Sequence, residues 1–450
     1  MRREPPLTTS SASALVAVPA GSESRRPYAG PLWLRAMPLV WSALLAMALA
    51  AALARLYGQS PLEVFRLLVA GTWGSSYGIG QVLFKATPLV FTGLAVAVAL
   101  RAGLFNVGAE GQITVGALAT ALCAAGLPAG TPAIVALPLS LLCGFAGGAA
   151  LGALTGLLKW KAGAHEVIVT ILLNFVVRAL MVGIGTLVFL KESMHTAEVI
   201  GAAQLSRLSR FVPALHGSAV NTALLLGVVV TALCGLLFSR TRPGFALRAV
   251  GENPEAARAA GLQIGRVQLL AFVLAGGLAG LGGANFVLGY KHYYEDGFSS
   301  GVGYLGIAVA VLGQRRPLGV LVGALLFGTL SQGGLAVNAL VPRELIDVLS
   351  AVVILTVATA SPEVRRLIAT LPRALTTEPE TSASAAAGRP PSSAPGQPRP
   401  APSPGPSAAT PPSSATPSGE SAASDLAELA PPLPPSTTPA TAATRRPLSS

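Results

Sequence analysis

Residues 239–266, SRTRPGFALRAVGENPEAARAAGLQIGR, form a polar segment with five arginines between two long apolar runs, and the rest of the chain is organised around it. Asn253 and Pro254 form a helix-start signal, because Asn is a preferred N-cap and Pro fits the first helical position. Glu255 falls in the first turn, where a carboxylate meets the positive end of the helix dipole. Gly261 is a typical residue to end a helix, so the pattern predicts a short capped helix over 254–260.

Two interpretations of this segment are open. A short arginine-bearing helix held between two membrane spans offers a surface to a soluble partner. The alternative is an ordinary positively charged loop on the cytoplasmic side of a membrane protein. Composition does not separate the two.

The composition indicates a protein that crosses a membrane many times. Hydrophobic residues make up 52% of the chain, charged residues only 11%, and the mean hydropathy is +0.62. Soluble domains average about 25% charged residues. A net charge of +12 could suggest nucleic acid binding, but the basic residues sit at the ends of apolar runs without interleaved aromatics, so nucleic acid is excluded as a partner. The three cysteines lie in apolar runs and suggest neither a disulfide framework nor a metal site.

The two ends of the chain differ from its middle. Residues 1–30 are rich in Ser, Pro and Arg, and are expected to be a disordered cytoplasmic leader. Residues 373–450 are dominated by Pro, Ser, Ala and Thr. Such a tail buries too little apolar surface to offset its ordering entropy, so it is expected to be disordered. Residues 31–372 are the predicted membrane domain.

The expected fold is all-α, a bundle of about ten transmembrane helices in contact with lipid. A span needs about 20 apolar residues. The third and eighth runs are shorter than this, which indicates broken helices or spans extended by flanking Gly-rich sequence. The ten runs cover residues 36–56, 82–100, 112–126, 132–158, 167–190, 219–238, 267–290, 302–313, 318–337 and 345–360.

The distribution of Lys and Arg supports an even number of spans with both termini in the cytoplasm. When ten spans alternate from an inner N-terminus, the basic residues gather in the inner loops, as the positive-inside rule requires. Losing one span between the third and the eighth would place 239–266 outside and destroy the pattern. Glycines at three- and four-residue spacing around 144–148 and 276–283 predict close helix packing in lipid.

Polar residues near the third run form the first candidate site. Asn106 and Glu110 are four residues apart and would share a helix face, with Gln112 close by. A glycine-punctuated polar segment at a span is typical of a discontinuous helix that lines a translocation path. The alternative is a corner at the cytoplasmic face with Glu110 solvated, and the predicted topology places the segment near that face.

The fifth run adds Asn174 and, four residues later, Arg178. A lone charge at mid-helix costs about 2.5–3.5 kcal/mol on insertion scales. Arg178 is therefore expected to face protein or water, with a carboxylate or carbonyl partner inside the bundle. Tyr293 and Tyr294, beyond the seventh run, are interpreted as interfacial anchors.

Four motifs together carry a family resemblance: RAGLFNVGAEGQ (101–112), HEVIVTILLN (165–174), ALRAVGENPEAARAAG (246–261) and GYLGIAVAVLG (303–313). They resemble the permease subunits of bacterial ABC importers, above all the ribose, nucleoside and simple-sugar class. The nucleoside-type permease that pairs with a second, different permease is the most similar. Branched-chain amino-acid permeases resemble the chain more distantly. The resemblance covers about residues 31–372.

The resemblance implies a multi-pass protein of the bacterial plasma (inner) membrane that imports a nucleoside or simple sugar. It is not an enzyme, and it holds neither metal nor cofactor: a partner ABC ATPase subunit binds ATP and Mg²⁺. The other implied partners are a second permease, forming a hetero-oligomer, and an extracellular or periplasmic solute-binding protein. In the family, a loop like 239–266 docks on the ATPase, which here implies the coupling residues Asn253, Pro254, Glu255, Ala256, Ala257, Arg258 and Gly261. Candidates for the translocation path are Asn106, Glu110, Gln112 and Asn174.

Rival functions stay in view. A channel would need a filter-like motif, and an integral-membrane transferase would need clustered His or Asp at one face; the sequence shows neither pattern. A secondary transporter would need intramembrane acids or histidines for ion coupling, and only Glu110 and Asp347 come near the membrane. A branched-chain amino-acid ABC permease would share the general architecture but carry a different solute.

Overall fold

The computed structural model describes residues 54–190 and 193–338, together with isolated residues at 48, 49, 51, 52, 340, 348 and 351. The chain divides into two units, Met1–Glu378 and Pro379–Ser450, and every described residue belongs to the first. The expected leader, the tail 373–450, most of the expected first span and nearly all of the expected last span lie outside the described residues.

The described part is helical, which confirms the predicted fold class for that part of the chain. Beyond three isolated β-bridges it holds no strand. Six of its helices, the fifth counted with its continuation to Lys291, are long and apolar enough to cross a membrane. The total of ten spans stays a prediction. The helices that match the expected runs are α3 (Ser76–Arg101), α4 (Ala109–Gly126), α5 (Ala133–Ala162), α6 (Glu166–Val188), α7 (Ala223–Arg240), α10 (Ile264–Gly282), α12 (Val302–Leu312) and α13 (Pro317–Val337).

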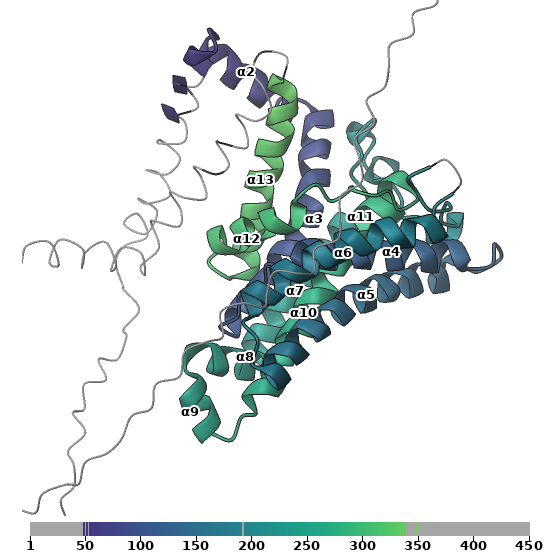
Figure 1. Cartoon of the computed structure of the whole chain (residues 1–450). Helices are drawn as coiled ribbons and strands as arrows, with labels where there is room; N and C mark the ends of the chain where they lie inside the picture. The colour runs from purple at the N-terminus through teal and green to yellow at the C-terminus, as the bar shows by residue number, and fades with distance from the viewer. Residues whose placement is uncertain are drawn as a thin grey trace, which may run out of the picture. The chain divides into compact units, whose positions relative to one another are not determined.

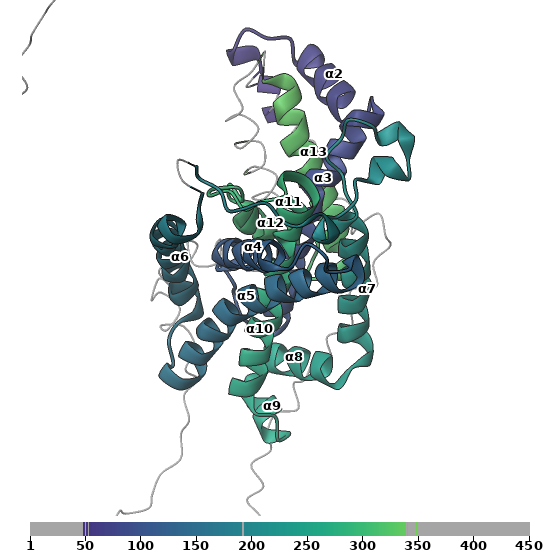
Figure 2. The same cartoon turned by 90° about the vertical axis from the view of Figure 1, so that its right-hand side faces the viewer.

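Helix α3 forms the centre of the larger hydrophobic core. It is buried along most of its length and packs against α7, α10, α12 and α13. Helix α10 continues through α11 (Ala284–Phe286) into a π-helical turn, Val287–Lys291. In both views, α8 (Arg242–Glu252) and α9 (Pro254–Ala259) lie at one end of this unit and α2 (Pro61–Thr72) lies at the other (Figures 1 and 2).

Glycines set the closest helix crossing, between α5 and α10. A Cβ built on Gly276 would collide with the carbonyl oxygen of Gly148, and one on Gly152 with that of Phe272. The two backbones therefore touch directly, without intervening side chains. This confirms the close packing predicted from the glycine spacing, which lets dispersion contacts hold helices together in lipid.

Three features of the structure were not predicted. Helix α2 precedes α3 and packs against α13. Helix α8 lies ahead of the predicted short helix. A layer of loops pairs residues 194–205 with 288–296, for example through Thr196 N donating to the Tyr294 carbonyl at 2.9 Å.

The loop layer corrects the interpretation of Tyr294 as an interfacial anchor. Tyr294 is fully buried and packs between Phe189 and Phe298. Burial raises the pKa of its phenol. An interfacial anchor would keep its hydroxyl in water, so this tyrosine is a core residue of the layer. Its neighbour Tyr293 stacks on His195 instead.

Candidate functional site

A cluster of buried polar side chains lies where the segment between α3 and α4 meets α6 and α12. Asn106 and Gln112 form its first pair: Asn106 Nδ2 donates to Gln112 Oε1 at 2.9 Å. Asn106 Oδ1 also accepts from the Gly108 amide at 3.0 Å. Both side chains are fully buried, and buried amides need such partners. The pair fixes the non-helical stretch that leads into α4.

Glu110 is the charged centre of the cluster. It lies in the first turn of α4, and its Oε1 accepts from Ser299 Oγ at 2.6 Å and from the Gly301 amide at 3.1 Å. Its Oε2 accepts from the Gly303 amide at 2.7 Å. The carboxylate therefore lies at the N-termini of both α4 and α12, where helix dipoles and free amides stabilise negative charge.

Two glycines make this contact possible. Gly301 has φ 85°, in the left-handed region that side chains disfavour. A Cβ on Gly303 would collide with the backbone at Glu110. The start of α12 therefore approaches the start of α4 more closely than any larger residue would allow.

Asn174 joins α6 to the cluster. Its Oδ1 accepts from the Gly111 amide at 2.9 Å, and its Nδ2 donates to the Val107 carbonyl at 3.0 Å. Its Nδ2 also lies 3.3 Å from the hydroxyl of Tyr304 on α12. Tyr304 is 42% exposed, so the cluster reaches the surface of the chain through this ring.

The structure thus brings together all four residues predicted for the path, and it corrects two details. Asn106 precedes α4 in a non-helical stretch, so it does not share a helix face with Glu110. Glu110 is only 8% exposed and is not solvated. Sequence reasoning missed the partners Ser299, Gly301 and Tyr304, although the glycines before α12 were a usable signal for a tight approach.

The cluster lies away from the level at which α3 and α12 end. Arg101 Nε donates to the Arg315 carbonyl at 3.1 Å, so the C-terminal ends of α3 and α12 lie at one level. The 11 residues of α12 rise up to about 16 Å from that level to the cluster.

At the end of the unit that carries α9, helix α8 connects the bundle to the predicted short helix. Thr241 caps α8, its hydroxyl accepting from the Gly244 amide at 3.1 Å. Leu247 and Val250 are buried against the bundle. Arg248 donates to the carbonyl of Phe238, near the end of α7. These contacts hold α8 firmly against α7.

Helix α9 confirms the predicted capped helix. Asn253 Oδ1 accepts from the Ala256 amide at 3.0 Å, Pro254 is the first helical residue, and Gly261 follows with φ 84°. Ala257 is its only buried residue, whereas Glu255 and Arg258 are exposed. The helix is thus attached through one alanine and presents its remaining surface outward (Figure 1).

The structure does not give Arg178 the carboxylate or carbonyl partner that was predicted for it inside the bundle. Arg178 lies on α6 and is exposed, and within the part of the chain that the structure describes it has no hydrogen-bond or ion-pair partner.

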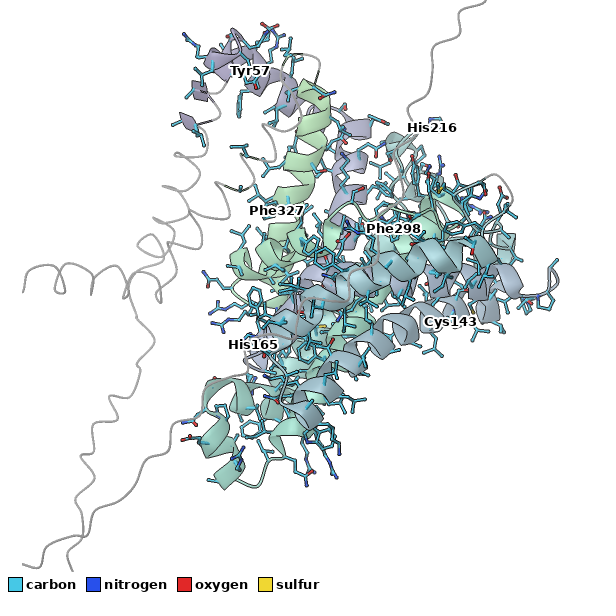
Figure 3. The ribbon with its side chains drawn as sticks, viewed as in Figure 1. Tyr57, Cys143, His165, His216, Phe298 and Phe327 are labelled. Atoms are coloured by element: carbon cyan, nitrogen blue, oxygen red, sulfur yellow. The ribbon has the colours of Figure 1, made fainter. Side chains whose placement is uncertain are left out.

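Helix α6 starts at Glu166, directly after His165. In Figure 3, His165 lies toward the end of the unit that carries α8 and α9, and Phe298 lies in the region where Figure 1 labels α11.

A family model described as a permease component of branched-chain amino acid transport systems matches residues 78–358. The chain belongs to this permease family. The permease is 34% identical to the guanosine ABC transporter permease NupP of Bacillus subtilis over 72% of the chain and 93% of that protein. It is 32% identical to the nucleoside ABC transporter permease NupB of Lactococcus lactis subsp. cremoris, over 67% and 85%.

A third relative is the glucose ABC transporter permease TsgB13 of Haloferax volcanii. It is 33% identical over 73% of the permease and 89% of its own length. Each of the same three organisms has a second matching permease, at 26–29% identity. The permease is thus a multi-pass membrane subunit of the ABC transporter type.

Proposed function

We propose that the permease carries a nucleoside or a simple sugar into the cytoplasm as the membrane subunit of an ATP-driven importer. The observation that carries this proposal is the match, over most of their length, to relatives named for nucleosides, guanosine and glucose. These solutes share a sugar ring with several hydroxyl groups. The buried cluster of Asn106, Glu110, Gln112 and Asn174 supports a path along the surface from which Tyr304 emerges, because polar segments at interrupted membrane helices line translocation paths.

A branched-chain amino acid is the second candidate solute, favoured by the description of the matching family model. Ion-coupled secondary transport fits less well. It needs a titratable group that is free to exchange a proton or bind an ion, and both carboxylate oxygens of Glu110 accept hydrogen bonds from within the chain.

We expect cells that express the permease together with a partner ATPase, a second permease and a binding protein to accumulate labelled guanosine or glucose. Accumulation should require ATP, and labelled leucine should stay at the level of cells without the permease. The measurement is initial uptake rate for each solute. ATP-dependent accumulation of leucine alone would assign the permease to amino acids instead.

The proposed orientation places α8 and α9 in the cytoplasm, with both termini on the same side and ten spans between them. The excess of Lys and Arg in the loops on this side supports it. In this orientation α9 faces the compartment that holds ATP. A separate ATPase binds ATP and Mg²⁺, and a binding protein delivers the solute on the opposite face.

Helix α9 is the proposed coupling helix. Asn253 and Pro254 fix its start, Gly261 fixes its end, and Ala257 seats it on the bundle, so it can move as a rigid body with α8. Glu255, Ala256 and Arg258 are exposed and supply the docking surface. Closure of the ATPase pair would push this helix, and the rearrangement of rigid helices would open the path inward.

We expect the double variant Glu255→Ala with Arg258→Ala to lose the ATPase. Both side chains are exposed, so the fold should be unaffected while the docking surface loses two charges. The ATPase recovered with the tagged permease should fall roughly tenfold, a difference of about 1.4 kcal/mol in binding. Arg66→Ala is the control, because Arg66 is an exposed arginine on α2, at the end of the unit away from α9 (Figure 1). Unchanged recovery of the ATPase in the double variant would remove the coupling role.

A further inference from the structure

Arg178 is a charge at the middle of a membrane span with nothing in the described chain to pair with it. It is the thirteenth of the 23 residues of α6, a helix long and apolar enough to cross a membrane. Each end of α6 is at least ten residues away, or about 15 Å. An arginine side chain snorkels to the interface only from near a helix end, so Arg178 cannot reach water by this route.

The position of Arg178 on α6 identifies the surface involved. The residues of α6 that are buried against the rest of the chain form one stripe: Thr170, Asn174, Val177, Met181 and Gly185. Arg178 lies one turn beyond Asn174, about 40° round the helix, at the border of this stripe. Ile171, Phe175 and Val182 are exposed on the same side. This Arg178 face is therefore apolar with a single cation at its centre.

An apolar face alone would suit lipid, but the cation does not. An unpaired guanidinium at mid-membrane requires a protein partner or water. A buried guanidinium is best satisfied by a carboxylate, which accepts two parallel hydrogen bonds from its planar fork. The complementary group is thus a carboxylate at the same depth.

A second copy of this chain is a poor source of that carboxylate. Among the described residues, Glu110 is the only buried acid, and its two oxygens are already occupied by Ser299 and the start of α12. A two-fold contact between identical Arg178 faces would also bring like charges together. Each of three organisms, in contrast, has two different permeases that match this chain.

We propose that the Arg178 face packs against a second, different permease, which supplies an intramembrane carboxylate to the guanidinium of Arg178. The proposal rests on the proposed function, since it assumes a transporter with two permease subunits. This contact would make the pairing of the two permeases specific, because a complex with the wrong partner leaves the charge of Arg178 unpaired inside the membrane.

The test co-expresses the full-length permease with the second permease and the ATPase of the proposed transporter. Arg178→Met keeps the length of the side chain and removes its charge, and it should lower the recovery of the second permease at least tenfold. Arg178→Lys should lower it less, because the charge remains. Arg210→Met is the control, since Arg210 is exposed in the segment between α6 and α7, outside the spans. Arg178→Met protein purified alone should melt at the wild-type temperature, which excludes misfolding.

A charge swap and a photo-crosslinker complete the test. Arg178→Glu should lose the second permease, and replacing one intramembrane carboxylate of the second permease by arginine should restore it. A benzoylphenylalanine at position 178 should crosslink to the second permease. Crosslinks only to lipid or to the same chain overturn the proposal. A second outcome also overturns the proposal: the Arg178→Cys variant reacts with a charged thiol reagent, and guanosine blocks this reaction. Such protection would place residue 178 on the solute path.

The proposed function is checked separately by uptake in wild-type cells. Absence of guanosine and glucose uptake with intact pairing would contradict the solute assignment and leave the Arg178 contact standing. Normal uptake with full pairing of the Arg178→Met variant would overturn the contact and leave the transport function standing.

Discussion

Replacing Glu110 by alanine is expected to lower the free energy of unfolding by about 3–5 kcal/mol and to abolish transport. Three donors would lose their acceptor at once: the Ser299 hydroxyl and the amides of Gly301 and Gly303. Each buried donor left without a partner costs about 1–3 kcal/mol, and charged hydrogen bonds stand at the upper end. Removal of the buried charge itself offsets part of this loss. Helix α12 would no longer be fixed to α4.

The measurement is thermal unfolding of the purified permease in detergent, together with uptake in cells. Ser299→Ala should lose only about 1 kcal/mol, because it removes one of the three donors and leaves the carboxylate its two amides. Glu63→Ala serves as the control, since Glu63 is an exposed acid on α2. If Glu110→Ala unfolds at the same temperature as Glu63→Ala, the carboxylate of Glu110 does not hold α4 and α12 together.

Gly276→Ala is the second change with a large expected effect. The added methyl group would overlap the carbonyl oxygen of Gly148 and crowd the Cα of Gly152 at 3.1 Å. Backbone atoms cannot rotate away, so α5 and α10 must separate along their crossing. Overpacking of this kind costs about 1–3 kcal/mol, and Gly276→Leu should cost more and prevent correct folding.

The matched control is Gly235→Ala on α7, where a Cβ meets no atom within 4 Å. This change should be neutral or slightly stabilising, because alanine favours the helix over glycine. Detergent melting of the two variants side by side separates the effects of packing and helix propensity. Equal melting temperatures for both variants would show that the α5–α10 crossing tolerates the extra volume.

Local signals explain the parts of the fold that were predicted correctly. Each span within the described residues matches an apolar run, because lipid requires apolar side chains and internally satisfied backbone over its whole thickness. The α9 helix was predicted with its cap and its end, since Asn253, Pro254 and Gly261 act on atoms within a few residues. The small-residue spacing likewise predicted close packing, although not which helices meet.

The candidate site was predicted only as a set of residues. The sequence placed four residues in one group, and the structure brings them together: Asn106, Glu110, Gln112 and Asn174. Their burial was not predicted, because the donors that satisfy Glu110 lie about 190 residues further along the chain. A carboxylate beside a loop has the same local sequence whether it faces water or the start of a distant helix. Tyr294 was misjudged for the same reason: its aromatic neighbours Phe189 and Phe298 come from two separate loops.

Hydropathy, charge asymmetry and capping residues, all read within short windows, determine that this chain is a helical membrane protein with an exposed capped helix between two spans. The tertiary structure alone decided that the starts of α4 and α12 meet and share one carboxylate, and that Arg178 is left without a partner in the described chain. Such facts depend on which distant backbone amides and side chains come within hydrogen-bond distance, and this is set by how the helices pack.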